Sequence, residues 1–373
     1  MRTWSEVNLD AINENINSIR SILNKDTKVL AVVKADAYGH GAAKVALSLV
    51  KNKIDYLGVA TSGEAMELRN IGIKTPILIL GAIYNENIGE LISNDITLTV
   101  FDYKTALNIS NVAKKLNKIA KIHIKIDTGM TRIGFYPTDD SVKEICKISK
   151  LDSIEIEGMF SHFAKADEED ENPTHIQFEK FMNIKNKLEE MKVQIPICHI
   201  CNSAGIIDFP EYQLNMVRSG IITYGHYPSE CVNHKKIKLT PAMTFKTLVA
   251  NINQIEKGTS VGYGGTFTAE KSMKIATLLV GYADGYSRLL SNKADVLING
   301  ERCSVVGRVC MDQTMVDVSK LKNINLGDEV ILFGKSGNNI VTVEEVAKII
   351  GTINYEILCA VSKRVPRIYI QGA

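Results

Sequence analysis

The first two thirds of this 373-residue chain alternate between short apolar runs rich in β-branched residues and longer amphipathic stretches. Eight of these runs are long enough to form strands, and a connecting segment follows each. Eight such units within about 230 residues favour a (β/α)8 barrel, because a doubly wound open sheet usually contains fewer strands. The predicted strands are Lys28–Val33, Tyr56–Ala60, Ile77–Leu80, Thr97–Val100, Lys121–Ile126, Glu155–Phe160, Ile197–Ile200 and Asn215–Arg218.

Helical periodicity occurs between these strands, with apolar residues every three or four positions in Asn111–Ile119, Ser141–Ser149 and His175–Met191. After residue 235, short strands are separated by turn signals such as Asn299-Gly300. The predicted strands there are Thr240–Gln254, Met273–Val280, Asp295–Ile298, Ser304–Val309, Thr314–Val318 and Glu329–Phe333. Val343–Ile350 is the one clearly helical segment of this region.

Two domains are therefore expected, a (β/α)8 barrel over residues 9–235 and a mostly β domain over residues 236–373. The opening strand, around Thr3–Val7, is grouped with the β domain as residues 1–8, although the sequence leaves its pairing open.

Composition excludes several classes of protein. The net charge is only +2, without a long basic block, so neither nucleic acid nor an anionic membrane is expected as a partner. No apolar run approaches the ~18 residues that a membrane span needs, and the polar N-terminus does not resemble a signal peptide. The seven cysteines suggest reduced thiols in the cytoplasm, and the seven histidines show no close metal-ligand pairing, so no metal is expected.

Functional groups of such barrels follow the carboxyl ends of the strands. Lys34 follows the first strand, and a tyrosine, a histidine and two glycines lie close to it in the sequence, at Tyr38, His40, Gly39 and Gly41. A single lysine there is more often a solvated strand cap. A lysine partly withdrawn from water, however, has a lowered pKa and acts as a base or forms a Schiff base, and the crowded neighbourhood favours this second interpretation.

Other polar groups lie within or just after the later strands. Lys125 lies inside or against strand five and is costly to bury without a partner. His162, after strand six, is more often structural than catalytic. Asn202-Ser203 and Ser219-Gly220 offer hydroxyls and backbone N–H groups where barrels commonly hold a phosphate. A lysine together with a phosphate site points to pyridoxal phosphate. In the second domain, Tyr263 lies in a glycine-rich turn and is either a turn aromatic or functional.

Eight motifs in order make the chain resemble the alanine racemases over essentially its whole length. They are AVVKADAYGHG (31–41), KIDTGMTRIG (125–134), CNSAG (201–205), RSGI (218–221), GYGGTF (262–267), GYADGY (281–286), GRVCMDQTMVD (307–317) and YEILCAVSKRVPR (355–367). The resemblance implies a barrel that binds pyridoxal 5'-phosphate, joined to a β domain. Gly262 and Ala360 depart from the usual Ser and Arg, which leaves room for a broader substrate range.

The resemblance also implies roles for individual residues. Lys34 would hold the cofactor as a Schiff base and serve as one base, and Tyr263 of the partner subunit would be the other. Arg218 would face the pyridine nitrogen, with His162 hydrogen-bonded to it. The residues that would surround the phosphate are Tyr38, Asn202, Ser203, Gly220, Ile221 and Tyr355.

Further implied roles concern the substrate. Arg132 and the Met311 backbone would hold its carboxylate. Lys125 would be carbamylated, which converts a costly buried cation into an anion that orients Arg132. Tyr282 and Arg288 would line the entrance.

The implied activity is the interconversion of L-alanine and D-alanine by a homodimer with shared active sites, which supplies D-alanine for peptidoglycan. A serine or broad-specificity racemase on the same scaffold is the alternative, although a bulky Tyr355 favours alanine. A basic amino-acid decarboxylase would need a carboxylate where Arg218 stands. A non-catalytic pyridoxal phosphate carrier would leave the second domain without a purpose.

Overall fold

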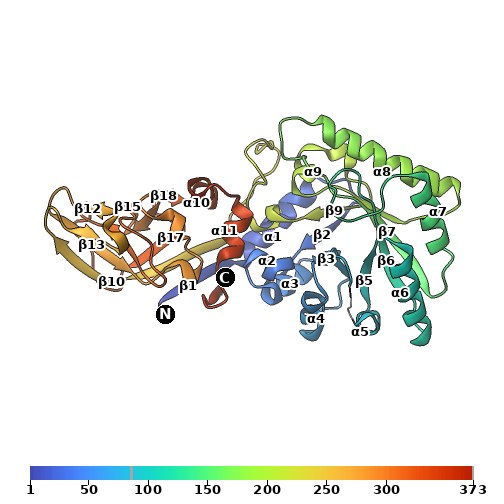
Figure 1. Cartoon of the computed structure of the whole chain (residues 1–373), viewed down its shortest axis with the longest axis horizontal. Coiled ribbons are helices and arrows are strands. Elements are labelled where there is room, and N and C mark those ends of the chain that lie inside the picture. Colours follow the sequence, from blue (N-terminus) through green and yellow to red (C-terminus); the bar gives the residue numbers. More distant parts are fainter. Residues whose placement is uncertain (85–86, 372–373) are drawn as a thin grey trace. The chain divides into compact units, whose positions relative to one another are not determined.

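The computed structural model describes residues 1–84 and 87–371 (Figure 1). The chain forms two compact units. The barrel unit consists of Ala11–Ala37 and Ala42–Pro241, and the β unit consists of Met1–Asp10, Tyr38–Gly41 and Ala242–Ala373.

Eight parallel strands form the centre of the barrel unit, in the order β8-β7-β6-β5-β4-β3-β2-β9. Backbone bonds from Asn215 N–H to the Cys198 carbonyl (3.1 Å) and from Arg218 N–H to the Cys201 carbonyl (3.0 Å) link the two edge strands, so the barrel is nearly closed. The eight predicted strands and the fold class are confirmed. The strands are β2 Lys28–Val32, β3 Tyr56–Val59, β4 Ile77–Ile79, β5 Ile96–Val100, β6 Ala120–Lys125, β7 Ile154–Phe160, β8 Ile197–His199 and β9 Met216–Ser219.

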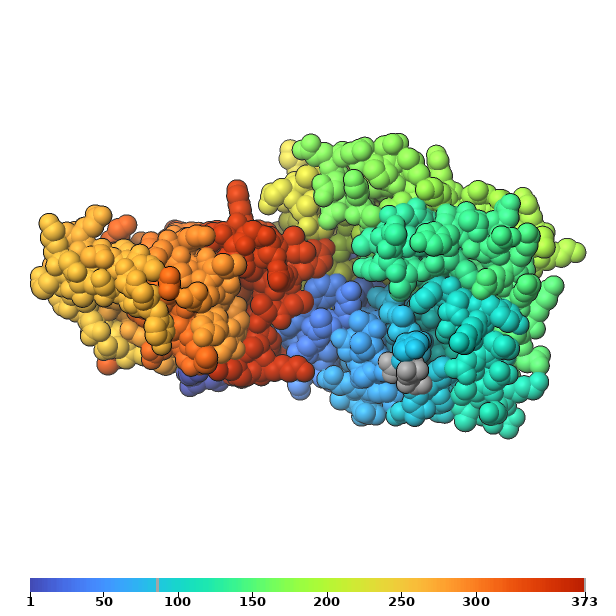
Figure 2. All heavy atoms as spheres, viewed as in Figure 1, coloured from blue at the N-terminus to red at the C-terminus, as the bar shows by residue number. Residues whose placement is uncertain are grey.

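Helices cover the outside of these strands, as Figure 1 shows for α3 to α8. In the space-filling view, helical residues coloured cyan and green form much of the surface of the barrel unit on this face (Figure 2). Strands covered in this way are apolar on both faces, which is why they read as continuous apolar runs. The helices are α1 Leu9–Ser21, α2 Lys34–Tyr38, α3 Ala42–Lys51, α4 Ser62–Asn70, α5 Ile88–Ser93, α6 Tyr103–Lys115, α7 Asp139–Ile148, α8 Asn172–Glu190 and α9 Ser203–Asp208.

The prediction of a helix over Asn111–Ile119 was wrong at both ends. Helix α6 begins at Tyr103, because the Asp102 carboxylate accepts the N–H of Thr105 at 2.7 Å and caps the first turn. It ends at Lys115, and Asn117 has a left-handed φ of 51° that stops the helix.

Nine strands of the β unit form one sheet that is antiparallel except for the pair β1–β19. Strand β1 pairs with β10 and β19, which decides the pairing that the sequence left open. The strands are β1 Thr3–Asn8, β10 Met243–Ile255, β11 Ser260–Val261, β12 Phe267–Thr268, β13 Met273–Leu278, β14 Asp295–Ile298, β15 Glu301–Ser304, β16 Thr314–Asp317, β17 Glu329–Ser336, β18 Asn339–Val341 and β19 Arg367–Ile370. The helices are α10 Val343–Ile350 and α11 Asn354–Ala360.

Two features of the β unit differ from expectation. The predicted strand Ser304–Val309 is wrong, because β15 ends at Ser304. Gly307 there has a φ of +74°, and a Cβ on it would lie 2.6 Å from the Val261 carbonyl oxygen, so the chain turns out of the sheet. The predicted helix Val343–Ile350 is confirmed as α10, whereas helix α11 was not anticipated.

Candidate active site

Lys34 follows β2 and opens a left-handed turn. Ala35, Asp36 and Ala37 have φ values of 52°, 53° and 53°, a conformation that costs roughly 1–2 kcal/mol per residue. Two carboxylates offset this cost. Glu64 Oε1 accepts the N–H of Ala35 at 2.7 Å, and Asp36 Oδ1 accepts a backbone N–H at the start of α3 at 2.7 Å. These bonds fix the backbone that carries the Lys34 amine.

Backbone N–H groups and a hydroxyl suited to an anion lie at the same edge of the barrel as Lys34. Strand β2 pairs with β9 in a register that sets Ala31 opposite Ser219, so both chains leave the sheet together. Just beyond β9, the Gly220 N–H donates to Ser203 Oγ at 3.1 Å. Helix α9 begins at Ser203 and a 3₁₀ turn begins at Ile221. First-turn N–H groups lack intrahelical acceptors and suit an anion.

Arg218 on β9 is a buried cation, with 4% of its surface exposed. Its Nη2 donates to the carbonyls of Ser161 (2.7 Å) and Ile200 (2.9 Å) and to His162 Nδ1 (3.1 Å). Burial lowers the pKa of Arg218 to about 10, which still leaves it charged at neutral pH. The predicted pair Arg218–His162 is present, and burial with the Arg218 charge holds the pKa of His162 well below its usual value.

Three residues that the sequence analysis did not single out form a chain of polar contacts that begins at Arg218. Its Nη1 lies 2.9 Å from His199 Nδ1, His199 Nε2 lies 2.9 Å from His123 Nδ1, and His123 Nε2 lies 3.3 Å from Glu157 Oε2. Burial favours the neutral Glu157, but hydrogen bonds from His123 and Lys121 lower its pKa to about 2. In the sequence, these residues could have been noticed only as a histidine or a glutamate within an otherwise apolar strand.

Lys125, at the end of β6, is buried and donates to the Ile126 carbonyl at 2.8 Å. Burial, and then the charge of Arg218, lowers its pKa to about 7. Asp127 fastens the loop that follows, because its carboxylate accepts the backbone N–H of Thr131 (2.9 Å) and of Arg132 (2.7 Å). Arg132 therefore lies in the loop that follows β6, and its positive charge acts on Lys125 at the end of that strand.

The β unit carries the other predicted side chains. Tyr263 is 69% exposed and lines a cavity of about 580 Å³ together with Met311. The N–H of Tyr282 donates to the Cys310 carbonyl at 3.0 Å, so its loop adjoins Met311. Burial raises the pKa of the Cys310 thiol, and the positive charge of Arg288 partly opposes this shift, so Arg288 also lies near Cys310. These four predicted residues therefore gather around the loop that contains Cys310.

The rings of Tyr38 and Tyr355 contact each other within the β unit, with ring centroids 5.9 Å apart. A Cβ on Gly39 would collide with the Leu358 carbonyl of α11, and Arg367 Nε donates to the Gly39 carbonyl at 2.9 Å. Burial raises the pKa of Tyr38, so its phenol is neutral. The close approach at Gly39 brings the two predicted phosphate ligands together.

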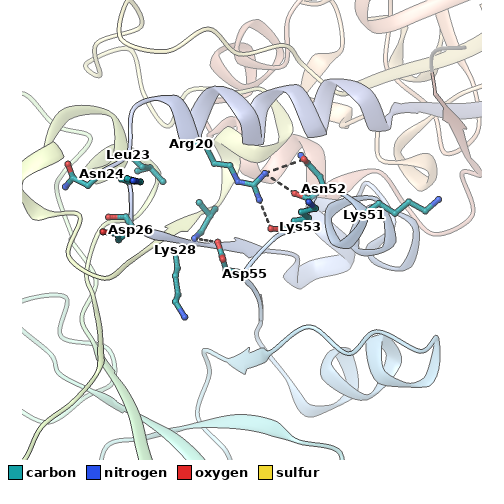
Figure 3. A pocket seen from close by; sticks show the side chains of 12 residues that line it. Arg20, Leu23, Asn24, Asp26, Lys28, Lys51, Asn52, Lys53 and Asp55 are labelled. Carbon is teal, nitrogen blue, oxygen red and sulfur yellow. Dashed lines mark hydrogen bonds between the residues drawn. The ribbon is translucent and has the colours of Figure 1, made fainter.

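A cavity of about 720 Å³ in the barrel unit lies at the opposite end of the strands (Figure 3). It is bounded by the end of α1, the start of β2 and the end of α3. Arg20 spans it and donates to the carbonyls of Asn52 (2.9 Å) and Lys53 (2.7 Å), as Figure 3 shows. Arg20 thereby caps α3, and none of the predicted site residues lines this cavity.

Within residues 1–84 and 87–371, no group of three or more His, Cys, Asp or Glu side chains could hold a metal ion. No helix in the described part of the chain is long and apolar enough to cross a membrane.

Comparisons with known proteins cover both units. Residues 7–228 match the family "Alanine racemase, N-terminal domain" and residues 242–369 match "Alanine racemase, C-terminal domain". The alanine racemase of Methanococcus maripaludis is 51% identical over 367 residues, which cover 98% of both chains.

Similar solved structures are also alanine racemases. The alanine racemase of Clostridium difficile 630 superimposes with a TM-score of 0.96 at 49% identity, covering 100% of this chain and 96% of that one. A complex of the same enzyme with cycloserine gives a TM-score of 0.94 at 47% identity, with the same coverage.

The two units and their matches with known proteins place the chain among the isomerases, in the class of amino-acid racemases. The chain belongs to the alanine racemase family.

Proposed function

We propose that this chain interconverts L-alanine and D-alanine, with pyridoxal 5'-phosphate as its cofactor. The observation that carries the proposal is the common edge at which β2 and β9 end, where Lys34 lies beside the Ser203–Gly220 cradle. A primary amine next to an anion site matches the two ends of pyridoxal phosphate, its aldehyde and its phosphate. Family membership supports the same activity.

The donors of the barrel unit suit this cofactor. Arg218 uses both of its Nη atoms for internal hydrogen bonds, and its Nε–H has no acceptor among the described residues. Nε–H is therefore free to donate to an unprotonated pyridine nitrogen. A guanidinium in that position disfavours protonation of the ring. The residues proposed to bind the phosphate are Tyr38, Asn202, Ser203, Gly220, Ile221 and Tyr355.

Racemisation needs a base on each face of the substrate. The bound cofactor supplies an electron sink that makes the α-hydrogen acidic. Lys34 then removes or returns the proton on one face, and Tyr263 does so on the other, each in the opposite protonation state. An amine from one subunit and a phenol from the other would provide these two faces.

A homodimer with shared sites is part of the proposal. Tyr263 and Met311 line an open surface cavity, and an exposed phenol of this kind is available to another chain. The partner subunit's Tyr263 would serve as the second base, and the partner subunit's Met311 would offer its backbone N–H to the substrate carboxylate. Arg132 would bind the same carboxylate, while Tyr282 and Arg288 would line the entrance. In this scheme residues 9–235 carry Lys34 and most of the cofactor ligands, and residues 236–373, with strand 1–8, also contribute to the partner's active site.

The setting is proposed to be the cytoplasm, and the D-alanine is proposed to supply peptidoglycan synthesis. All seven cysteines are free thiols, which suits a reducing compartment.

Lys125 is proposed to carry a carbamate. Carbamate formation joins a neutral amine to CO2 and releases one proton. Burial holds the pKa of Lys125 at about 7, so a large share of this amine is neutral at neutral pH, unlike an ordinary lysine. The carbamate would place an anion near Arg132, which removes the cost of a buried ammonium.

In ¹³C-bicarbonate, we expect one carbamate NMR signal that grows as the pH rises through about 7, following the fraction of neutral Lys125. Lys125→Met should lack this signal, whereas Lys121→Met, on the same strand but half exposed, should retain it. A signal of equal intensity in the Lys125→Met protein would contradict the assignment.

Racemase assays with L-alanine and with L-serine test the proposed function. We expect turnover of alanine to exceed that of serine by at least tenfold, because the Tyr355 phenol leaves room for little more than a methyl group (about 1–3 kcal/mol of discrimination). Comparable turnover of both substrates would favour a broad-specificity racemase. Absence of turnover with either, in protein that contains the cofactor, would favour the carrier.

A further inference from the structure

A chain of hydrogen bonds links Arg218 to Glu157 through two histidines, and all of its bonds are donated in the same direction, from Arg218 towards Glu157. A guanidinium has donors and no acceptor, so His199 Nδ1 must accept from Arg218 Nη1 across 2.9 Å. The proton of His199 is then on Nε2 and is donated to His123 Nδ1 at 2.9 Å. The proton of His123 is likewise on Nε2, and it is donated to Glu157 Oε2 at 3.3 Å. Each imidazole has a single tautomer that satisfies this chain.

Both histidines are neutral, as the chain requires. They are buried completely, and this burial lowers the pKa of each, with the positive charge of Arg218 acting in the same direction. A protonated histidine would have two donors and could not accept from its neighbour. The direction of the chain is therefore set at its ends, by a cation at one end and a carboxylate at the other.

Glu157 is well suited to end the chain. Its Oε1 accepts from Lys121 at 2.7 Å, and its Oε2 accepts from Thr97 Oγ1 at 3.2 Å as well as from His123. The carboxylate is buried, with 6% exposed, whereas Lys121 reaches solvent. An ionised carboxylate has only acceptors, so it forces a donor onto His123 Nε2.

Packing holds the two imidazoles in line. The Phe160 ring stacks on His199 at 4.9 Å with an angle of 5° between the planes, and Arg218 Cζ lies 5.5 Å from the same ring. Gly158 leaves space for His123, because a Cβ there would lie 2.5–2.7 Å from its ring atoms. Packing therefore restrains the planes of both rings, and the hydrogen-bond partners at the two ends of the chain select their tautomers.

Arg218 depends on these acceptors. No carboxylate lies within ion-pair distance of it in the described residues; its partners are the carbonyls of Ser161 and Ile200 and the rings of His162 and His199. With the other tautomer of His199, an N–H would face Arg218 Nη1, and the two donors would repel. The guanidinium would then move from the position that presents its Nε–H.

We propose that Glu157 is a positioning residue for Arg218, because its carboxylate fixes the tautomers of His123 and His199 and thereby the direction in which Arg218 Nε–H points. The inference rests on the proposed function, in which Arg218 faces the pyridine nitrogen. Glu157 itself touches neither the cofactor nor the substrate.

The first test uses the wild-type protein without cofactor, labelled with ¹⁵N-histidine. NMR should show His123 and His199 each as a single neutral tautomer with the proton on Nε2. A proton on Nδ1 of either ring in the wild-type protein overturns the proposal, whatever the enzyme's activity.

The second test removes the acceptor. Glu157→Met keeps an unbranched side chain of similar size but leaves His123 Nε2–H unpaired, so we expect a mixture of tautomers at His199. Turnover should fall by about 10–100-fold, the range typical of residues that orient a primary ligand. KM for alanine should change little, because the substrate carboxylate is assigned to Arg132.

Two further variants separate positioning from a general structural effect. Glu157→Gln retains one acceptor oxygen and should restore both the His199 tautomer and most of the turnover. Glu155→Gln, an exposed position two residues earlier on β7, should change neither. If folded Glu157→Met keeps the wild-type tautomers, or if Glu155→Gln lowers turnover equally, the proposal is wrong. Because the tautomers are read without cofactor, this outcome is distinct from a failure of the racemase assignment.

Discussion

Lys34→Ala should abolish racemisation together with the visible absorbance of the covalently bound cofactor. Removing a general base alone typically lowers turnover by about 10²–10⁴-fold, and this variant also loses the covalent attachment. The backbone should be retained, because the left-handed turn after Lys34 is held by the carboxylates of Glu64 and Asp36 rather than by the lysine side chain. Turnover and the absorbance spectrum of the purified variant are the two measurements.

Lys28→Ala is the matched control for this experiment. Lys28 begins the same strand, β2, at its exposed opposite end, so its removal alters charge equally but should change neither measurement. If Lys34→Ala retains the cofactor absorbance or substantial turnover while Lys28→Ala behaves like wild type, Lys34 does not carry the cofactor.

Mixing two inactive variants should restore activity. Lys34→Ala lacks the base of the barrel unit, and Tyr263→Ala lacks the base of the β unit, so each homodimer is inactive. A two-fold interface builds two equivalent sites, each combining residues from both chains. A mixed dimer would then contain one doubly defective site and one intact site. With random assortment half of the dimers are mixed, so about a quarter of wild-type activity should return.

Subunit exchange has to be verified independently, for example with two differently tagged chains. If both bases of a site came from the same chain, every site in the mixture would lack one of them. Verified exchange without recovered activity would therefore rule out the shared site, while the assignment to the racemase family would stand.

Local sequence was sufficient wherever an element depends on its own residues. The barrel strands were predicted to within a few residues, because strands covered on both faces are continuous runs of apolar β-branched residues. Helix α10 was predicted with correct ends, and Thr342 caps it by accepting the Glu345 N–H at 3.0 Å. The start of α6 was missed although Asp102 gives an equally local capping signal.

Elements that depend on distant contacts were not predictable in the same way. Helix α11 is short and has no side-chain cap, so its stability comes from packing. The segment after Ser304 reads as a strand, but Gly307 lies against Val261, more than forty residues away, and this close contact ends the strand. The pairing of β1 with β10 joins segments that are more than two hundred residues apart.

The sequence by itself determined the barrel, the β domain and the groups at the strand ends, because alternation along a strand and the position after it are local properties. Only the tertiary structure decided how Arg218 is held. His199, His123 and Glu157 come from three strands, and each looks like an isolated polar residue in an apolar segment. Their function arises from pairing across the barrel interior, where burial forces every donor to find an acceptor, and no local pattern encodes which residues will meet there.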